Sequence, residues 1–291
     1  MQIAYYPGCS LNASSKLYDI QCRKVFKRLE IELKEIDDWS CCGATSACKT
    51  DYIQSLALPA RNLGIADASG LSELLIPCSS CYSRTLVSQK TLNGNTELKD
   101  KINEGLSNKV LGKVKISSIL EILLFMAHSG KIAEKLAKKM DGLKPACYYG
   151  CLLTRFPADI KISDDVENPK GMEAVCRAFG ADPQDWSYKT DCCGASASVN
   201  DTETSLPLMS RILKDAIARG ANCLVTTCPM CQMNMDSYQD RVCEIFGIPK
   251  RLPVFFITEL LGIAMGLTPD ELEIEGHFVD CLGLLRGLKL L

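Results

Sequence analysis

The chain has 291 residues, of which 47% are hydrophobic and 23% charged, a composition typical of folded globular proteins and not of disordered ones. Because this length exceeds the usual size of one compact core, we expect two domains. The formal net charge of -2, without a basic stretch interleaved with aromatic residues, argues against nucleic acid as a partner.

The N-terminus, MQIAYYPGCS, lacks the basic region, long apolar run and small-residue cleavage site of a secretory signal. No run of roughly eighteen apolar residues could span a bilayer. We therefore expect a cytoplasmic protein without a membrane span. Since the cytoplasm keeps thiols reduced, metal-binding thiolates explain the 17 cysteines better than disulfides do.

Predicted strands and helices alternate along the first half of the chain. Residues 2–6 form a short apolar segment typical of a strand, and Cys9 follows it. Residues 53–70 combine mixed apolar spacing with a terminal glycine, which predicts an amphipathic helix ending at a C-cap. The compact apolar run at residues 73–77 fits a buried strand, and Cys78 follows directly.

A charged segment links the two halves. It extends from about residue 93 to residue 145, and we interpret it as solvated connecting helices and not as a functional basic patch. We place the domain boundary near its end, which gives a first domain of residues 1–143 and a second of residues 144–291.

The second half shows the same alternation, with predicted strands at residues 146–149 and 223–227 and a predicted helix at residues 206–220. Each half should run strand, cysteine, helix, strand, double cysteine, helix, strand, paired cysteines, helix, strand and helix. This order predicts an α/β fold of two homologous domains, each a mainly parallel sheet flanked by helices. In such sheets, sites gather at the carboxyl ends of the strands, which is where the cysteines lie.

The order repeats because the sequence itself repeats. The matched segments are IAYYPGCSL (3–11) with ACYYGCLL (146–153), SCCGATSA (40–47) with DCCGASAS (191–198), GLSELLIPCSSC (70–81) with GANCLVTTCPMC (220–231), and VKISSILEILL (114–124) with PVFFITELLGI (253–263). The last match aligns Glu121 with Glu259. Each half is therefore one copy of a single unit, related to the other by internal duplication.

Each copy supplies a single cysteine, an adjacent pair and a C-x-x-C pair. The first set is Cys9, Cys41, Cys42, Cys78 and Cys81, and the second set is Cys151, Cys192, Cys193, Cys228 and Cys231. A tetrahedral zinc and a cubane iron–sulfur cluster each need four ligands, so five is one too many. Because two adjacent thiolates rarely fit one tetrahedral ion, they would more easily reach different metal atoms. This favours a polynuclear iron–sulfur cluster over zinc or purely redox-active thiols.

Glycine and histidine residues bear on the proposed metal sites in different ways. Gly43 and Gly194 follow the double cysteines and would let the backbone approach a cluster closely. His128 and His277, the two histidines, lie outside the repeat, and we interpret both as structural or surface residues.

Seven cysteines lack repeat partners, and we expect them to be buried small apolar residues. They are Cys22, Cys48, Cys147, Cys176, Cys223, Cys243 and Cys281. Cys147 is an alternative first ligand of the second set, but the shared YY and GC pattern favours Cys151.

The arrangement C-x31-C-C-G-x34-C-x-x-C, repeated in the second half, resembles the cysteine-rich CCG domain found in the B subunit of heterodisulfide reductase from methanogens. The resemblance covers nearly the whole chain. It implies two noncubane [4Fe-4S] clusters, each held by the five cysteines of one set, and a role for all ten in metal binding and catalysis. The second half departs from the first, with 40 residues between Cys151 and Cys192 against 31 between Cys9 and Cys41.

The resemblance also implies a function: catalytic reduction of the coenzyme M–coenzyme B mixed disulfide to two thiols during methanogenesis. A disulfide needs two electrons, whereas an iron–sulfur cluster usually passes one at a time. We therefore expect the disulfide to lie between the two clusters, at the interface of the halves. Because the substrate is anionic, Lys49, Arg84 and Arg155, which lie close in sequence to the cysteines, are candidate binding residues.

The chain contains neither a ferredoxin-type cysteine run nor a nucleotide fingerprint, so electrons must come from partners. By resemblance these are the ferredoxin-like C subunit and the flavin-containing A subunit of heterodisulfide reductase, linked to a hydrogenase or formate dehydrogenase. The apolar tail at residues 281–291 would suit docking if exposed, although core burial explains it equally well. Two alternatives remain: a CCG protein of another anaerobic respiratory complex, of the lactate or glycolate oxidation or succinate dehydrogenase type, and a noncatalytic metal-stabilised scaffold.

Overall fold

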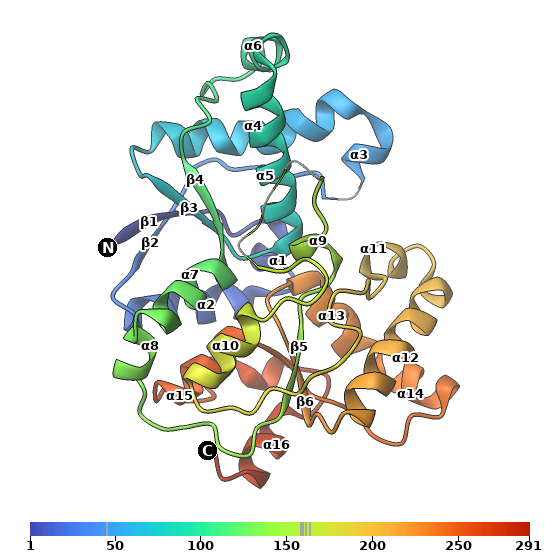
Figure 1. Cartoon of the computed structure of the whole chain (residues 1–291). Coiled ribbons are helices and arrows are strands. Elements are labelled where there is room, and N and C mark those ends of the chain that lie inside the picture. Colours follow the sequence, from blue (N-terminus) through green and yellow to red (C-terminus); the bar gives the residue numbers. More distant parts are fainter. Residues whose placement is uncertain (45, 158–159, 161, 163) are drawn as a thin grey trace.

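Two parallel sheets organise the two halves of the chain in the computed structural model, which describes residues 1–44, 46–157, 160, 162 and 164–291 (Figure 1). The first half holds a four-stranded sheet of order β2-β1-β3-β4. Its strands are β1 (Gln2–Tyr5), β2 (Glu32–Glu35), β3 (Glu73–Ile76) and β4 (Lys115–Ser118). Its helices are α1 (Cys9–Asn12), α2 (Lys16–Arg28), α3 (Ala47–Thr50), α4 (Tyr52–Ala68), α5 (Ser79–Gly94), α6 (Thr96–Glu104), α7 (Ile119–His128) and α8 (Lys131–Glu134).

The second half holds a three-stranded parallel sheet of order β5-β6-β7. Its strands are β5 (Pro145–Tyr148), β6 (Cys223–Thr226) and β7 (Val254–Phe256). Its helices are α9 (Cys151–Thr154), α10 (Gly171–Ala178), α11 (Ala195–Ser198), α12 (Thr202–Ala218), α13 (Pro229–Ser237), α14 (Gln239–Phe246), α15 (Ile257–Ala264), the short 3-10 helix η1 (Ile274–Gly276) and α16 (Cys281–Gly287). The predicted α/β fold with two mainly parallel sheets is confirmed.

Local sequence explains the long helices that precede the central strands. The side chain of Asp51 caps α4 by accepting from the N–H of Gln54, and Asp201 caps α12 by accepting from Thr204. Each helix is followed by a glycine with positive φ, 74° at Gly70 and 83° at Gly220, a conformation that favours glycine at a C-cap. The helices predicted at residues 53–70 and 206–220 are therefore present as α4 and α12. Helix α4 begins one residue earlier than predicted and α12 four residues earlier, and each ends two residues earlier.

One predicted element of the second half is wrong. The shared order predicts a strand between Cys151 and Cys192, but none occurs among the described residues there. The N–H groups of Asp182 and Gln184 donate to Leu143 and Pro145, so this segment does run beside β5. Because Pro145 has no N–H to return a bond, the ladder stays incomplete.

The duplication is visible in the hydrogen bonds that start α7 and α15, the helices that follow the last strand of each half. The Ser118 N–H donates to Glu121 Oε2 at 2.7 Å, and the Phe256 N–H donates to Glu259 Oε2 at 2.7 Å. Both carboxylates therefore satisfy an otherwise unpaired N–H at the start of a helix. The sequence alignment of Glu121 with Glu259 is thus matched by an equivalent structural role.

Helices α7 and α15 each pack against the opposite half. Helix α7 lies beside α10, and α15 lies against α2 (Figure 1). The Tyr18 ring stacks on Phe256 with centroids 3.8 Å apart, and its hydroxyl donates to the Thr227 carbonyl at 2.9 Å. Gln21 Nε2 donates to Glu259 Oε1 at 2.9 Å. One apolar core consequently extends across both halves, while the proposed boundary at residues 143 and 144 stays a prediction.

The C-terminal tail belongs to this shared core. Cys281, Leu282 and Leu285 in α16 are buried, as is Leu290 beyond it. Of the two interpretations of the tail, core burial is therefore the one observed. Among the described residues, no helix is both long and apolar enough to cross a membrane.

Candidate metal centre

The ten repeat cysteines follow the strands or lie at the starts of the next helices. Cys9 begins α1 just after β1, and Cys78 directly precedes α5 after β3. In the second half, Cys151 begins α9 after β5, and Cys228 precedes α13 after β6. Since the strands of each sheet are parallel, their carboxyl ends bring these segments together at one edge.

In the first half, the five sulfurs form one connected group. Cys9 Sγ lies 3.9 Å from Cys41 Sγ, and Cys42 Sγ lies 3.3 Å from Cys81 Sγ. Hydrogen bonds between Cys41 and Cys42, and between Cys78 and Cys81, join these pairs. The sequence-predicted first set therefore comes together in space.

In the second half, all five cysteines line one cavity of about 80 Å³. Cys151 is hydrogen-bonded to Cys192, and Cys231 is hydrogen-bonded to both Cys193 and Cys228. The second half also contributes Tyr149, Leu152, Ala195, Ser196 and Met230 to the cavity walls. The first half contributes Ser79. The second set is thus also brought together, beside a side chain from the other domain.

The geometry favours Cys151 over Cys147 as a member of the second set. Cys147 lies in β5, is fully buried, and has its Sγ 3.8 Å from the Sγ of Cys176, outside the repeat. Cys151 instead contacts Cys192 and lines the cavity. As ligands, all ten cysteines stay predictions.

Two glycines shape the space around the sulfurs. Gly8 has φ 78°, and a Cβ there would lie 2.9 Å from Cys81 Sγ. Gly150 has φ 68°, and a Cβ there would lie 3.2 Å from Cys231 Sγ. In both halves a glycine is therefore required by backbone conformation and by close approach to a sulfur.

The glycines after the double cysteines support them through the backbone. The Gly43 N–H donates to Cys41 Sγ at 3.4 Å, and the Gly194 N–H donates to Cys192 Sγ at 3.3 Å. Their φ angles are 79° and 83°. Such N–H groups stabilise an anionic sulfur, as a metal-binding thiolate requires.

In each set, the surroundings lower the pKa of at least one cysteine and so favour its thiolate form. A hydrogen bond from Cys41 is the largest of the contributions that lower the pKa of Cys42 to about 3. In the second half, a hydrogen bond from Cys151 is the largest of those that lower the pKa of Cys192 to about 6. Because the thiolate is the metal-binding form, both sets are chemically suited to metal.

Within the described ranges, no group of three or more His, Cys, Asp or Glu side chains is arranged to hold a single metal ion. Each half supplies five sulfurs, and a glycine, Gly8 or Gly150, closely approaches one of them. Five donors suit a cluster of several metal atoms better than one tetrahedral ion.

The two sets meet at the interface of the halves. Cys78 of the first set is hydrogen-bonded to Cys228 of the second. At the opposite end, Cys9 and Cys41 are exposed, and their counterparts Cys151 and Cys192 are partly exposed. Each set therefore extends from the surface to a buried inner end that faces the other set.

Of the three candidate cations, two act on the cysteines. Arg84 lowers the pKa of Cys42, after the larger effects of hydrogen bonds, and Arg155 lowers the pKa of Cys192 in the same subordinate way. Arg84 Nε is buried without a hydrogen-bond partner among the described residues. Lys49 lies exposed in the last turn of α3.

Several structural residues were missed or misjudged from the sequence. Cys48 is exposed and Cys243 is partly exposed, so the prediction that all unmatched cysteines are buried is wrong for these two. The other five are buried, as predicted. Neither position belongs to a regular apolar pattern, and this lack of a pattern could have indicated that both lie at the surface.

A buried ion pair that the sequence analysis did not anticipate joins the loop before the second double cysteine to α10. Lys189 Nζ donates to Glu173 Oε1 at 2.6 Å, and the two side chains are 2% and 3% exposed. Tyr149 also donates its hydroxyl to Glu173, and the N–H groups of Tyr149 and Gly150 donate to the Lys189 carbonyl. This network fixes the Gly150 turn that precedes Cys151.

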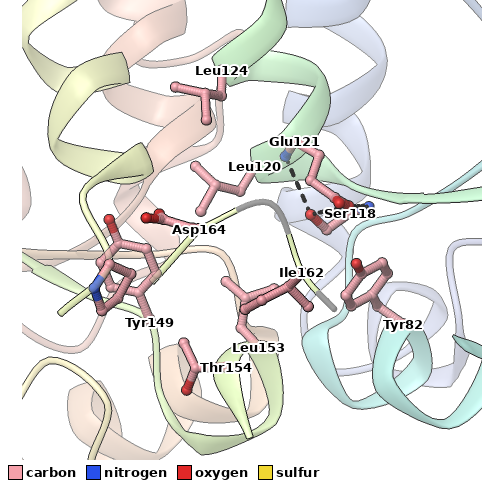
Figure 2. Close-up of a pocket in the computed structure, with 11 residues that line it drawn as sticks. Tyr82, Ser118, Leu120, Glu121, Leu124, Tyr149, Leu153, Thr154, Ile162 and Asp164 are labelled. Atoms are coloured by element: carbon pink, nitrogen blue, oxygen red, sulfur yellow. Dashed lines mark hydrogen bonds between the residues drawn. The ribbon is translucent and has the colours of Figure 1, made fainter. Parts of the chain in front are cut away.

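A smaller cavity lies between the halves, and Figure 2 shows the residues that line it. Its volume is about 30 Å³. Tyr82 and Glu121 of the first half face Tyr149 and Leu153 of the second across it. Tyr149 lines both this cavity and the cysteine-lined one. Among the described residues that line the smaller cavity there is no cysteine, so we place the site at the larger one.

The fold and the two facing cysteine sets define a duplicated, thiol-rich α/β protein. Residues 3–84 and 146–236 both match the family described as "Cysteine-rich domain", known as CCG. The chain therefore belongs to the CCG cysteine-rich domain family, as the sequence resemblance predicted.

Curated relatives extend over nearly the whole chain. The chain is 30% identical to the membrane anchor of the 8-methylmenaquinol:fumarate reductase of Wolinella succinogenes, over 97% of this chain and 99% of that protein. It is 31% identical to the B subunit of the ferredoxin:CoB-CoM heterodisulfide reductase of Methanosarcina mazei, over 97% of this chain and 92% of the relative. By their names, both relatives are subunits of reductases.

A solved structure supports the fold. A hypothetical protein from Helicobacter pylori superposes with a TM-score of 0.76 at 14% sequence identity, covering 95% of this chain and 51% of that one. This chain thus corresponds in fold to about half of that protein.

Proposed function

We propose that this chain is the iron–sulfur subunit of a multisubunit oxidoreductase, and that it reduces the coenzyme M–coenzyme B mixed disulfide at two noncubane [4Fe-4S] clusters. The proposal rests on one observation above all: the two cysteine sets meet at Cys78 and Cys228, beside a cavity lined by the second set. A substrate at this interface would contact both domains.

The overall reaction consumes one disulfide, two electrons and two protons, and it yields two thiols. When bound, the clusters would supply the one-electron transfers. The chain's own residues hold and surround the reactants. Cys42 and Cys193 are buried beside the inner cysteines, where water is largely excluded. Arg84 and Arg155 contribute positive charge that favours an anionic substrate.

The exposed ends of the cysteine sets suit electron entry. Cys9 and Cys41 lie at the surface, so a partner protein could approach the first cluster closely. In our proposal the partners are a ferredoxin-like protein and a flavoprotein of the same complex, linked to a hydrogenase or formate dehydrogenase in the cytoplasm. The curated relatives support partner subunits in general, because their names place them in multisubunit reductases.

A second candidate has a specific observation in its favour. The Wolinella relative is matched over 99% of its own length at 30% identity and is named as part of a quinol:fumarate reductase. The same cysteine sets could then pass electrons between quinol and the fumarate or succinate site of a respiratory complex, without disulfide chemistry.

Protein purified without oxygen separates these candidates in two steps. Iron and acid-labile sulfide are measured first, and about eight irons per chain support two four-iron clusters. Zinc without sulfide would contradict both candidates. Reduction of the coenzyme M–coenzyme B disulfide by reduced methyl viologen is then assayed, with cystine as a control substrate. Cluster-loaded protein that leaves the mixed disulfide intact would support the respiratory candidate instead.

A further inference from the structure

The N-terminal turn of α5 contains two buried hydroxyl groups that lack partners. Ser79 and Ser80 lie between Cys78 and Cys81, and the two serines are 2% and 1% exposed. Within the described part of the chain, neither Oγ has a hydrogen-bond partner. Buried polar groups are nearly always paired in folded proteins, so an unpaired hydroxyl points to a missing ligand atom.

Only one of these hydroxyls belongs to the cysteine-lined cavity. Ser79 lines that cavity together with all five cysteines of the second set, although it belongs to the first half. Ser80 is not among the described residues that line it. The two serines therefore share chemistry, burial and helix position but differ in access to the cavity.

The hydroxyl has no counterpart from the other half. The repeat aligns Ser79 with Pro229 and Ser80 with Met230. Proline offers neither a side-chain donor nor a backbone N–H. At this aligned position, the hydrogen-bond donor is thus present in the first half only.

The surroundings of Ser79 favour an anionic acceptor. Ser79 is the first residue of α5, a helix of 16 residues whose N-terminal dipole favours negative charge. Leu152 and Met230 provide apolar walls, while the exposed Ser196 lies at the cavity as well. A small organic thiolate combines an anionic sulfur with an apolar carbon chain and matches both features.

We propose that the Ser79 hydroxyl donates a hydrogen bond to the sulfur of a small thiolate bound next to the second cluster, on the side of the cysteine-lined cavity where Ser79 lies. Ser79 would thereby position one of the two thiol halves of the substrate from across the domain interface. This inference rests on the function proposed above and adds a ligand-binding residue to it.

The test compares Ser79→Ala with the matched control Ser80→Ala. Wild type and both variants are purified without oxygen, and iron and acid-labile sulfide are measured first. Calorimetric titration with 2-mercaptoethanesulfonate then gives a dissociation constant for each protein. We expect Ser79→Ala to bind about tenfold more weakly, as for loss of one hydrogen bond to an anion, and Ser80→Ala to bind like wild type.

Several results would overturn the inference. They are equal binding by Ser79→Ala and wild type, an equal loss in both variants, or no thiolate binding by cluster-loaded wild type. A changed visible spectrum of thiol-free Ser79→Ala with unchanged affinity would also count against it, because the hydroxyl would then act on the cluster. Wild type without iron and sulfide would instead overturn the function on which the inference rests.

Discussion

Cys78 and Cys228, which lie in different halves of the chain, are hydrogen-bonded to each other across the domain interface. Each follows the strand that lies inside its sheet, β3 between β1 and β4, and β6 between β5 and β7. The duplication therefore places two equivalent strand ends face to face. As a result, ten cysteines that would form two separate sites become a continuous array of sulfur donors.

Replacing a double cysteine should remove one cluster. Cys42→Ser is expected to lower the iron content from about eight to about four per chain, because a serine hydroxyl does not replace a buried thiolate ligand. Cys193→Ser should do the same for the second set. Iron and sulfide analysis measures this, with Cys243→Ser as the control outside both sets. Unchanged iron in Cys42→Ser would remove Cys42 from the ligand set.

Disulfide reduction provides a second readout for these variants. If both clusters are needed, Cys42→Ser and Cys193→Ser should each lose turnover while Cys243→Ser retains it. Full activity in either cysteine variant, with an altered cluster spectrum, would contradict a mechanism that requires two clusters.

Adding a methyl group at Gly8 should disturb the first cysteine set more than the strain of a positive φ angle alone would. The new Cβ of Gly8→Ala would lie 2.9 Å from Cys81 Sγ, at φ 78°. Gly70→Ala is the matched control, because it has φ 74° with no atom within 4 Å of the added Cβ. The control should cost about 1 to 2 kcal/mol in unfolding free energy.

Gly8→Ala should cost more than this control in urea unfolding and should also lower the iron content, whereas Gly70→Ala should keep its iron. Equal iron in both variants would show that Gly8 is needed only for its backbone conformation.

The buried pair of Lys189 and Glu173 should be costly to break. Lys189→Met leaves the Glu173 carboxylate buried without its cation, and we expect a loss of about 3 kcal/mol or more in unfolding free energy. The double variant Lys189→Met/Glu173→Gln should recover part of this loss. The surface pair of Lys170 and Asp185 supplies the control, because Lys170→Met should cost at most about 1 kcal/mol. Urea unfolding that gives equal losses for both lysine variants would contradict the expected role of burial.

His277 should make the stability of the protein depend on pH. Burial alone lowers the pKa of the imidazole, but the charge of Glu259 and hydrogen bonds to Asp236, Cys281 and Glu259 raise it well above its usual value. The folded state therefore keeps His277 protonated at a pH where the unfolded chain has lost that proton. Because the folded-state pKa is raised, the stabilisation is complete below about pH 6.5, the unfolded value, and decreases as pH rises.

Wild type and His277→Gln test this by urea unfolding between pH 6 and pH 9. The advantage of wild type should be about 3 kcal/mol or more at the lower end. Above about pH 7 it should fall by about 1.4 kcal/mol per pH unit. An advantage that does not change with pH would mean that the native imidazole is neutral.

Much of the fold and of the candidate site followed from local sequence. The repeat, the apolar runs that became β1, β3, β5 and β6, and the glycine-terminated helices α4 and α12 are patterns within short windows, and such patterns predict secondary structure well. The predicted strand missing from the second half failed for a different reason. The segment that contains Asp182 and Gln184 runs beside β5, which begins at Pro145. Proline has no N–H to complete the ladder, and the sequence alone does not tell which segment lies beside that proline.

The sequence by itself determined that two sets of five cysteines follow equivalent strands, because covalent spacing and apolar patterning are local properties. Only the tertiary structure decided that Cys78 meets Cys228, that Ser79 enters the cavity of the other domain, and that His277 is enclosed by carboxylates. These contacts join residues far apart in the chain; Gln21 and Glu259, for example, are 238 positions apart. Such pairings depend on how helices and sheets pack, which no local pattern specifies.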